Sequence, residues 1–197
     1  MKNNTCSKSA VSLLEVMVTI TLFMVGLVSV YSVVSSTLRL NEYNKNFIIA
    51  SQLAREQMEM VSHIRDYNFV NIRNWKALDA SGSNFWQTGN YYTVQNTPGY
   101  FLDLDIQQIP DFAEGESYLT TNMASYKMCL NSENKYRYDC ETDVTPGFYR
   151  YLFVDEVRDE FGNREPDALK FVSRVIWYKG GYEQTDISLI LTDWQRR

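Results

Sequence analysis

Histidine, cysteine and clustered basic residues are scarce in this sequence of 197 residues. One histidine and three cysteines are too few for a zinc site of the usual spacing. The 19 Lys and Arg are outnumbered by 24 Asp and Glu, and the net charge of −5 argues against nucleic acid as a partner, because phosphate binding depends on clustered cations. Neither a P-loop nor the motifs G-x-S-x-G and H-E-x-x-H occur. We therefore expect no catalytic site, no metal and no cofactor.

A long apolar run near the N-terminus decides the class of protein. From Val11 to Val34 the residues are apolar or small, with Glu15 as the only charge, and this length suffices to cross roughly 30 Å of hydrocarbon as a helix. The run exceeds the apolar core of about 7–15 residues in a secretory signal, although VVSST at 33–37 is an alternative signal-peptidase site. Residues 1–10 carry Lys2 and Lys8 and no acid, so the C-terminus is expected to be exported.

The stretch SAVSLLEVMVTITLFMVGL resembles the N-terminal segment of type IV pilins and pseudopilins. In that family, a short basic leader and a small residue at the cleavage point precede a pattern close to F-T-L-[IL]-E-[VL]-[ML]-[VI]. Ala10 falls on the residue before the cut, Val11 on the first mature residue and Glu15 on the glutamate of the family. The family usually has Gly before the cut and Phe after it, and major pilins often carry a Pro near the place where Ser32 stands. These departures favour a minor pilin, and the resemblance covers about residues 1–40.

The resemblance implies a structural function rather than an enzymatic one. A prepilin peptidase would cut between Ala10 and Val11, the new terminus of Val11 would be N-methylated, and Val11 and Glu15 would carry filament assembly. The amine of one subunit would be neutralised by Glu15 of a neighbour, because charges buried in a low dielectric need partners. The expected partners are the prepilin peptidase, other pilin subunits, the pilus assembly machinery and the cytoplasmic membrane.

The implied localisation is the inner (cytoplasmic) membrane, as a single-pass protein with an exported C-terminus, and then an extracellular or periplasmic filament. Such a filament, a pilus or a pseudopilus, serves adhesion, motility, DNA uptake or protein secretion. The alternative is a single-pass membrane-anchored extracytoplasmic binding domain that does not polymerise.

The whole sequence predicts an α+β fold. Residues 1–10 are the expected leader, 11–36 the membrane and assembly helix, and 37–67 an amphipathic helix with Ile49, Leu53, Met60 and Ile64 at helical spacing. His63 lies on this helix with no Cys or second His near it, and we expect it to be solvated rather than a ligand or a base. Residues 68–197 form the expected head, divided into a loop region (68–145) and an antiparallel meander (146–197).

The expected strands of the meander are GFYRYLFVDEV, ALKFVSRVIWYK and TDISLILTDWQ, with turn residues at Gly162-Asn163 and Gly180-Gly181. SYKMCLN is a candidate fourth strand, and NYYTVQ and GYFLDLD are short strands within the loop region. The apolar face of the meander is expected to pack on the amphipathic helix.

Three features of the head are open to more than one interpretation. Its loop region is rich in aromatic side chains that either fill the core or form an adhesive platform for sugars: Trp75, Phe85, Trp86, Tyr91, Tyr92, Tyr100 and Phe101. Cys129 and Cys140 remain once Cys6 leaves with the leader, and a disulfide between them is expected in an exported domain, with two free thiols or a metal half-site as alternatives. The acidic stretch DEVRDEFGNREPD is either a solvated hairpin loop or a Ca²⁺ site.

Overall fold

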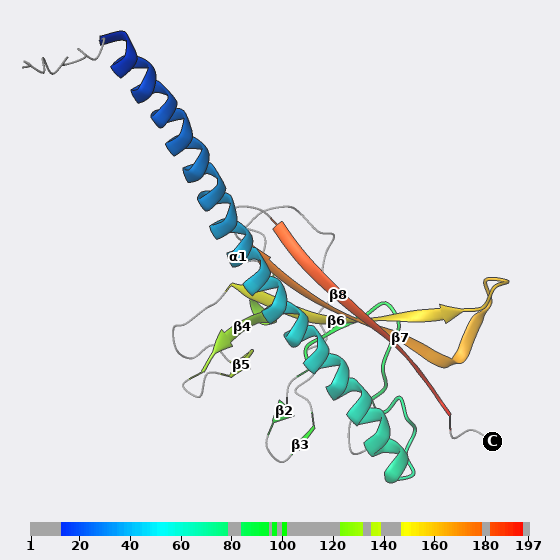
Figure 1. Ribbon diagram of the computed structural model, residues 1–197. Helices are drawn as coiled ribbons and strands as arrows, with labels where there is room; N and C mark the ends of the chain where they lie inside the picture. The colour runs from blue at the N-terminus through cyan, green and yellow to red at the C-terminus, as the bar shows by residue number, and fades with distance from the viewer. Residues whose placement is uncertain are drawn as a thin grey trace, which may run out of the picture. The chain divides into compact units, whose positions relative to one another are not determined.

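The computed structural model of the chain describes residues 13–78, 84–94, 96–97, 100–101, 123–131, 135–138, 147–178 and 182–194. Its first element is the helix α1, Leu13–Val70, drawn as one continuous ribbon in Figure 1. The two helical segments expected for 11–36 and 37–67 are thus one helix, and Asn41, Asn44 and Asn46 do not interrupt it. By compactness the chain divides into two units, residues 1–45 and residues 46–197.

The helix α1 ends at Val70, slightly beyond the expected end at residue 67, in a Schellman arrangement. The Arg73 N–H donates to the Asn68 carbonyl (2.8 Å), and the Ile72 N–H donates to the Phe69 carbonyl (3.1 Å). Ile72 occupies the left-handed position of this arrangement with φ 55, a conformation in which glycine is usual. An isoleucine there is strained, because its branched Cβ approaches the backbone.

The second unit contains an antiparallel sheet of six strands, so the expected α+β class and the helix-on-sheet arrangement are confirmed. The meander consists of β6 (Phe148–Arg158), β7 (Arg164–Tyr178) and β8 (Tyr182–Thr192), and the strand order is β5-β4-β6-β7-β8. The expected fourth strand is β4 (Lys127–Leu130), which pairs with β6 and with β5 (Tyr136–Arg137). β1 (Tyr91–Tyr92) also pairs with β6, β2 (Asn96–Thr97) pairs with β3 (Tyr100–Phe101), and a 3₁₀ turn covers Ala124–Tyr126.

The turn between β6 and β7 follows the chemistry that its sequence predicts. Gly162 has φ 83, and Asp159 accepts from the backbone N–H groups of Phe161 (2.9 Å) and Asn163 (2.8 Å). The Asn163 side-chain amide donates to the other Asp159 oxygen (3.0 Å). The predicted turn at Gly162-Asn163 is confirmed, whereas the one at Gly180-Gly181 lies outside the described residues.

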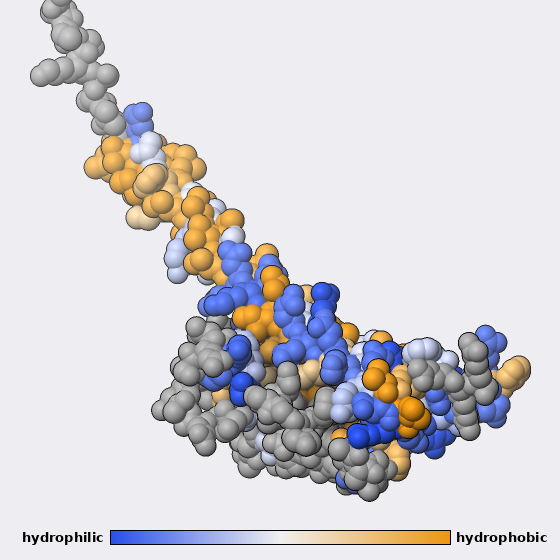
Figure 2. Space-filling view, turned by 90° about the horizontal axis from the view of Figure 1, so that it is seen from below, coloured by the Kyte–Doolittle hydropathy of each residue, from blue (hydrophilic) through white to orange (hydrophobic). Residues whose placement is uncertain are grey.

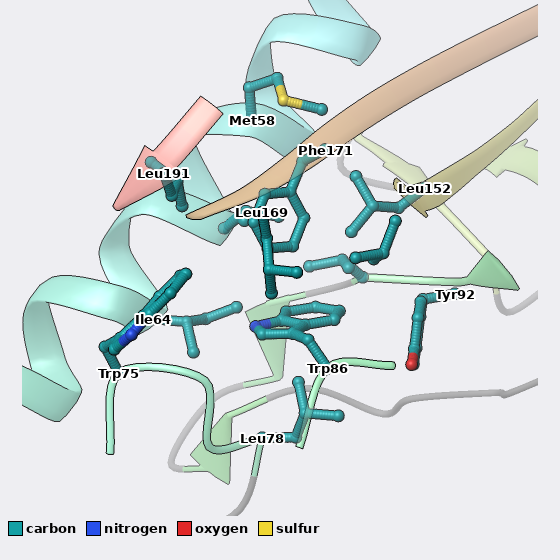
Figure 3. Packing of buried hydrophobic residues seen from close by; sticks show 13 residues of the cluster. Met58, Ile64, Trp75, Leu78, Trp86, Tyr92, Leu152, Leu169, Phe171 and Leu191 are labelled. Atoms are coloured by element: carbon teal, nitrogen blue, oxygen red, sulfur yellow. The ribbon is translucent and has the colours of Figure 1, made fainter. Parts of the chain in front are cut away.

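The core of the head lies between α1 and one face of the sheet. One apolar cluster joins α1 to β6, β7 and the loop after the helix, with the indole of Trp86 packed beside Phe171 and Tyr92 (Figure 3). A second cluster lies toward the N-terminal side of this part of α1: Ala50, Leu53, Ala54, Met128, Phe148, Val175 and Trp177. Met123, Tyr126, Tyr149, Tyr151 and Ile176 form a third cluster, to which β6 and β7 contribute residues that alternate with those facing α1.

The buried stripe of α1 differs in detail from the expected one. Leu53 and Ile64 are buried as predicted, but Ile49 and Met60 are only half-buried. The stripe also includes two polar residues, Gln57 and Asn68, which lie at helical spacing from Leu53 and Ile64 and are buried despite their polarity.

Candidate functional site

The N-terminal part of α1 is apolar on all sides and exposed. Its large hydrophobic side chains remain open to the surroundings, with Leu13 at 77%, Phe23 at 67% and Tyr31 at 76% exposure. Figure 2 shows the same surface as a nearly continuous apolar band along the first part of the helix. A helix that is hydrophobic on every side requires an apolar surrounding, and α1 is long and apolar enough to cross a membrane, by length and composition only.

Three hydroxyl side chains in this segment donate hydrogen bonds to carbonyls of the same helix. The hydroxyls of Thr19 and Thr21 donate to the carbonyls of Val16 (2.9 Å) and Val18 (2.8 Å). Ser29 donates to the Val25 carbonyl (2.9 Å). Because each hydroxyl proton bonds within the helix, these residues add little cost to burial in hydrocarbon.

Glu15 lies in the first turn of α1, and its side chain is exposed. A carboxylate in this turn is stabilised by the unpaired N–H groups and the positive end of the helix dipole. Ala10 and Val11 lie outside the described residues, so the cleavage, methylation and assembly assignments stay predictions.

A layer of polar side chains separates the two clusters beneath α1, and sequence reasoning missed it. We call Glu56, Gln57, Tyr138, Arg150 and Ser173 the polar layer. Gln57 stands between Ala54 and Met58 on the helix, Arg150 between Phe148 and Leu152 on β6, and Ser173 between Phe171 and Val175 on β7. The available signal was an arginine at an inward position of GFYRYLFV, where strand alternation predicts an apolar residue.

Arg150 is the centre of the polar layer, with its side chain only 2% exposed. One terminal nitrogen donates to the Leu53 carbonyl (2.9 Å) and to Glu56 (3.1 Å), and the other donates to the Val94 carbonyl (3.3 Å). Its Nε donates to the Tyr138 hydroxyl (2.8 Å). The cation therefore links α1, β6 and the loop after β1. Its hydrogen bonds compensate for the hydration that a charge loses when it is buried.

Tyr138 and Gln57 complete the polar layer. The Tyr138 hydroxyl donates to the Arg150 carbonyl (3.2 Å) and accepts from the Gln57 amide (3.4 Å), while Gln57 accepts from the Ser173 hydroxyl. Burial raises the pKa of the Tyr138 hydroxyl, and the Arg150 guanidinium partly offsets the rise. These contacts position the helix on the sheet, and none of them provides a reactive group.

Most of the aromatic residues that the structure describes belong to the core rather than to a platform. Trp75, Trp86 and Tyr92 are buried in the first cluster, so the core interpretation is confirmed for them. Tyr91 is half-buried, stacked near Tyr151 and Phe153, and Phe85 is 40% exposed. The structure does not describe the side chains of Tyr100 and Phe101.

The other candidate residues are distributed over the head. His63 is on the exposed side of α1, as expected. Cys129 is buried on β4 and takes part in a disulfide; Cys140 lies outside the described residues, so their pairing stays a prediction. In the acidic stretch, Asp159 closes the turn, and Glu156 pairs with Arg158 (3.2 Å) and Arg164 (3.4 Å). Over the described ranges, no three Asp, Glu, His or Cys side chains are grouped as metal ligands would be.

A cleft of about 460 Å³ opens beside the C-terminal end of α1. Phe69, Ile72, Arg73, Trp75 and Lys76 line one part of it, and the ends of β7 and β8 contribute Asp167 and Asp193. The Lys76 ammonium donates to the Pro166 carbonyl (2.6 Å) and lies 5.1 Å from the centre of the Trp75 ring. The cleft thus combines apolar side chains with two cationic and two acidic ones.

Compared with known proteins, the chain matches no family model, no curated protein and no solved structure.

Proposed function

We propose that this protein is a structural subunit of a type IV pilus-like or pseudopilus filament. It is made as a precursor with residues 1–10 as leader, held in the cytoplasmic membrane by α1, cut between Ala10 and Val11, and assembled through its N-terminal helix. The proposal rests on the resemblance of SAVSLLEVMV to the family segment and on one structural observation. That observation is the exposed apolar surface of the first part of α1.

The exposed surface supports the proposal through its energetics. Removing apolar surface from water lowers the free energy by roughly 25 cal/mol for each Å². A segment in which Leu13, Phe23 and Tyr31 are all more than half exposed therefore requires an apolar partner that covers it. Lipid hydrocarbon is one such partner before assembly, and apolar helices of other subunits are another after it. A helix that uses both in succession leaves the membrane without exposing its side chains to water.

Glu15 supports the assembly step. A carboxylate at the centre of a spanning helix raises the free energy of membrane insertion by about 2.5–3.5 kcal/mol. Near an end of the helix, where Glu15 lies, the cost is smaller. Cleavage before Val11 creates an amine that pairs with Glu15 of a neighbouring subunit and offsets this cost. The pair forms only when helices pack together, so it couples processing to assembly.

Processing is tested by intact-mass and N-terminal peptide mass spectrometry of the full chain made with an active prepilin peptidase or with a catalytically dead one. We expect a mature chain that begins at Val11 and is one methyl group heavier, formed only with the active enzyme. A chain that keeps residues 1–10 beside the active enzyme contradicts processing at Ala10 and favours the non-polymerising membrane-anchored domain.

Assembly is tested by Glu15→Ala, with Glu59→Ala on the exposed side of the same helix as the matched control. We expect Glu15→Ala to yield mature chain in the membrane but no sheared filament, because the new amine lacks its counter-charge, while Glu59→Ala assembles normally. Filament recovery is measured by immunoblotting of the sheared fraction and by electron microscopy. Normal filaments from Glu15→Ala argue against the pairing.

A further inference from the structure

The strand β8 forms a long and regular edge of the sheet. It stands last in the strand order, and the described part of the chain contains no strand that pairs with its outer side. All 11 residues of β8 pair with β7 without a register shift. The strands at the opposite side of the sheet are short, with two residues in β1 and in β5 and four in β4. A long edge presents a row of backbone groups to which another strand can bond.

The pairing with β7 determines which backbone groups of β8 point outward. The Asp193 N–H donates to the Asp167 carbonyl (2.9 Å), so this opposed pair is a hydrogen-bonded one. Hydrogen-bonded and non-hydrogen-bonded pairs alternate along an antiparallel ladder. Every second residue of β8 therefore directs its N–H and its carbonyl to the outer edge, and no described residue bonds to these groups: Gln184, Asp186, Ser188, Ile190 and Thr192.

This edge lacks the features that usually discourage the addition of a strand. The stretch YEQTDISLILT contains no Lys, Arg or Pro, and no bulge interrupts its pairing. Its acidic residues are Glu183 and Asp186, and the Asp186 carboxylate already accepts hydrogen bonds of 2.7 and 2.6 Å from Arg174. From Ile187 to Thr192 the strand carries no charge, so nothing there repels a further strand.

The apolar face of the sheet is incomplete at β8. Phe171 and Val175 of β7 are fully buried beneath α1, whereas Ile187 and Leu189 of β8, which face the same side, are only half-buried. A further strand with apolar side chains on this side would cover the remaining surface of both residues. On the opposite face, the side chains along the edge are mostly polar. The edge therefore suits a strand in which apolar and polar residues alternate.

A second copy of β8 does not suit this edge. Antiparallel pairing of two β8 strands places a two-fold axis perpendicular to the sheet. This axis would reverse the direction of α1, which packs on a face of the sheet from Ile49 onward. Copies anchored in one membrane by α1 all carry this helix in the same direction. The choice of a different protein as occupant thus rests on the proposed function, whereas the unbonded edge itself does not.

We propose that β8 binds an extended segment of a partner protein, which adds to the sheet as an antiparallel strand. Its backbone bonds to the outward groups of β8, its apolar side chains lie on the α1 side, and its polar side chains lie on the other face. In such strand addition the main-chain bonds provide affinity and the alternate side chains provide selectivity. The antiparallel direction continues the sheet, in which each described pairing is antiparallel.

The proposal is tested with a synthetic peptide of alternating threonine and valine, roughly nine residues long to match the edge. Its partner in the assay is the full chain in lipid nanodiscs. In the proposed arrangement the threonines share a face with the Ser188 side chain, and their N–H groups point at β8. Methylation of the threonine nitrogens should therefore abolish pairing, whereas methylation of the valine nitrogens should not.

Fluorescence anisotropy measures the binding of the three peptides. We expect a Kd below about 100 μM for the unmodified and the valine-methylated peptides, and a Kd at least about tenfold higher for the threonine-methylated one. Equal affinities of the two methylated peptides, or the reverse order, overturn the proposed pairing. So does a lack of binding beyond that to empty nanodiscs.

A variant of the protein locates the binding at β8. Ser188→Pro removes an outward N–H but no bond to β7, and edge strands tolerate proline at such a position. We expect Ser188→Pro to fold and to weaken peptide binding at least about tenfold, while the matched control Ser188→Thr binds normally. Unchanged affinity in a folded Ser188→Pro protein overturns β8 as the site. Should this variant not fold, the two methylated peptides decide, because they leave the protein unchanged.

The oligomeric state of the full chain in detergent tests the choice of occupant. We expect analytical ultracentrifugation to give the same size for the unmodified chain and for Ser188→Pro, because β8 does not join copies of the protein. An oligomer that Ser188→Pro dissolves would make a second copy the occupant and overturn the assignment to a partner protein. A failure of cleavage before Val11 contradicts the proposed function alone and leaves the peptide result unaffected.

Discussion

At the residue scale, Arg150 illustrates how a buried cation is accommodated in the head. It occupies an inward position of β6, between two apolar residues, and it donates hydrogen bonds to the Leu53 carbonyl of α1, to the Tyr138 hydroxyl and to the Val94 carbonyl. Its counter-charge, Glu56, is half exposed, so solvent screens the ion pair and its net contribution is small. The hydrogen bonds to carbonyls therefore dominate the contribution of Arg150 to stability.

Truncation of this side chain should destabilise the head strongly. We expect Arg150→Ala to lower the free energy of unfolding by roughly 3 kcal/mol, because buried carbonyls and the Tyr138 hydroxyl lose their donor. Arg158, whose side chain is 66% exposed, provides the matched control. Arg158→Ala should change the free energy of unfolding by less than about 0.5 kcal/mol. Denaturant unfolding in detergent measures both, and similar values for the two variants would contradict the assignment.

Tyr151 gives a prediction about pH. Burial raises the pKa of its hydroxyl to about 12, although the nearby Arg174 acts in the opposite direction. The folded-state pKa exceeds the ordinary value of 10.0, so the stability from this group is complete below pH 10 and is lost as the pH rises toward 12. Ultraviolet titration should show tyrosines that ionise late, and Tyr151→Phe should reduce the amplitude of this late change by one tyrosine, because Tyr138 also ionises late. A Tyr151 that titrates near pH 10 in the folded protein would refute this.

At the element scale, α1 and the meander are held together by two apolar clusters with the polar layer between them. Polar groups that are fully hydrogen-bonded specify one register, because a shift along the helix would leave Gln57 and Arg150 unpaired. The register of β7 against β8 is supported in a similar way, because Arg174 lies opposite Asp186. The guanidinium donates hydrogen bonds of 2.7 and 2.6 Å to the two carboxylate oxygens. Hydrogen bonding to Asp186 raises the pKa of the Arg174 guanidinium, which stays charged throughout.

The C-terminal end of α1 gives a prediction of its own. We expect Ile72→Gly to raise the free energy of unfolding by about 1 kcal/mol, because the left-handed conformation penalises a branched residue and suits glycine. Thermal unfolding measures the change. Val70→Gly, within the last turn of the helix and 82% exposed, is the control and should be destabilising instead. A decrease in stability with Ile72→Gly would show that the isoleucine is not strained.

At the scale of the whole molecule, the chain combines a unit that needs an apolar surrounding with one that has its own core. The apolar clusters of the head draw on α1 from Ile49 onward, within the unit of residues 46–197. The exposed apolar segment of α1 lies N-terminal to this point. The exposed apolar segment and the core of the head are therefore formed by separate parts of the chain.

Truncation should separate them in practice. We expect a chain that begins at Asn46 to stay in the aqueous fraction without detergent and to unfold cooperatively, because its core is complete. The full chain should remain in the membrane fraction. Fractionation and near-ultraviolet circular dichroism measure the two properties. Aggregation of the truncated chain without detergent would mean that the first unit supports the folding of the second.

The sequence by itself determined the elements whose patterns are local. A continuous apolar run predicts a spanning helix, and alternation over β6, β7 and β8 predicts a meander, because both signals arise between near neighbours in the chain. The leader and assembly residues Ala10, Val11 and Glu15 are likewise assigned from local sequence alone, and they stay predictions.

Only the tertiary structure decided where the polar residues of the core find partners. Ser173 bonds to Gln57 across 116 positions, and Arg150 bonds to the Leu53 carbonyl across 97. No periodicity connects residues so far apart, since their proximity depends on how α1 lies on the sheet. The same holds for the cleft, whose lining comes from the end of α1, the loop after it and the ends of two strands. Hydrophobic patterning identifies which side chains are buried, but the pairing of buried polar groups is set by packing in three dimensions.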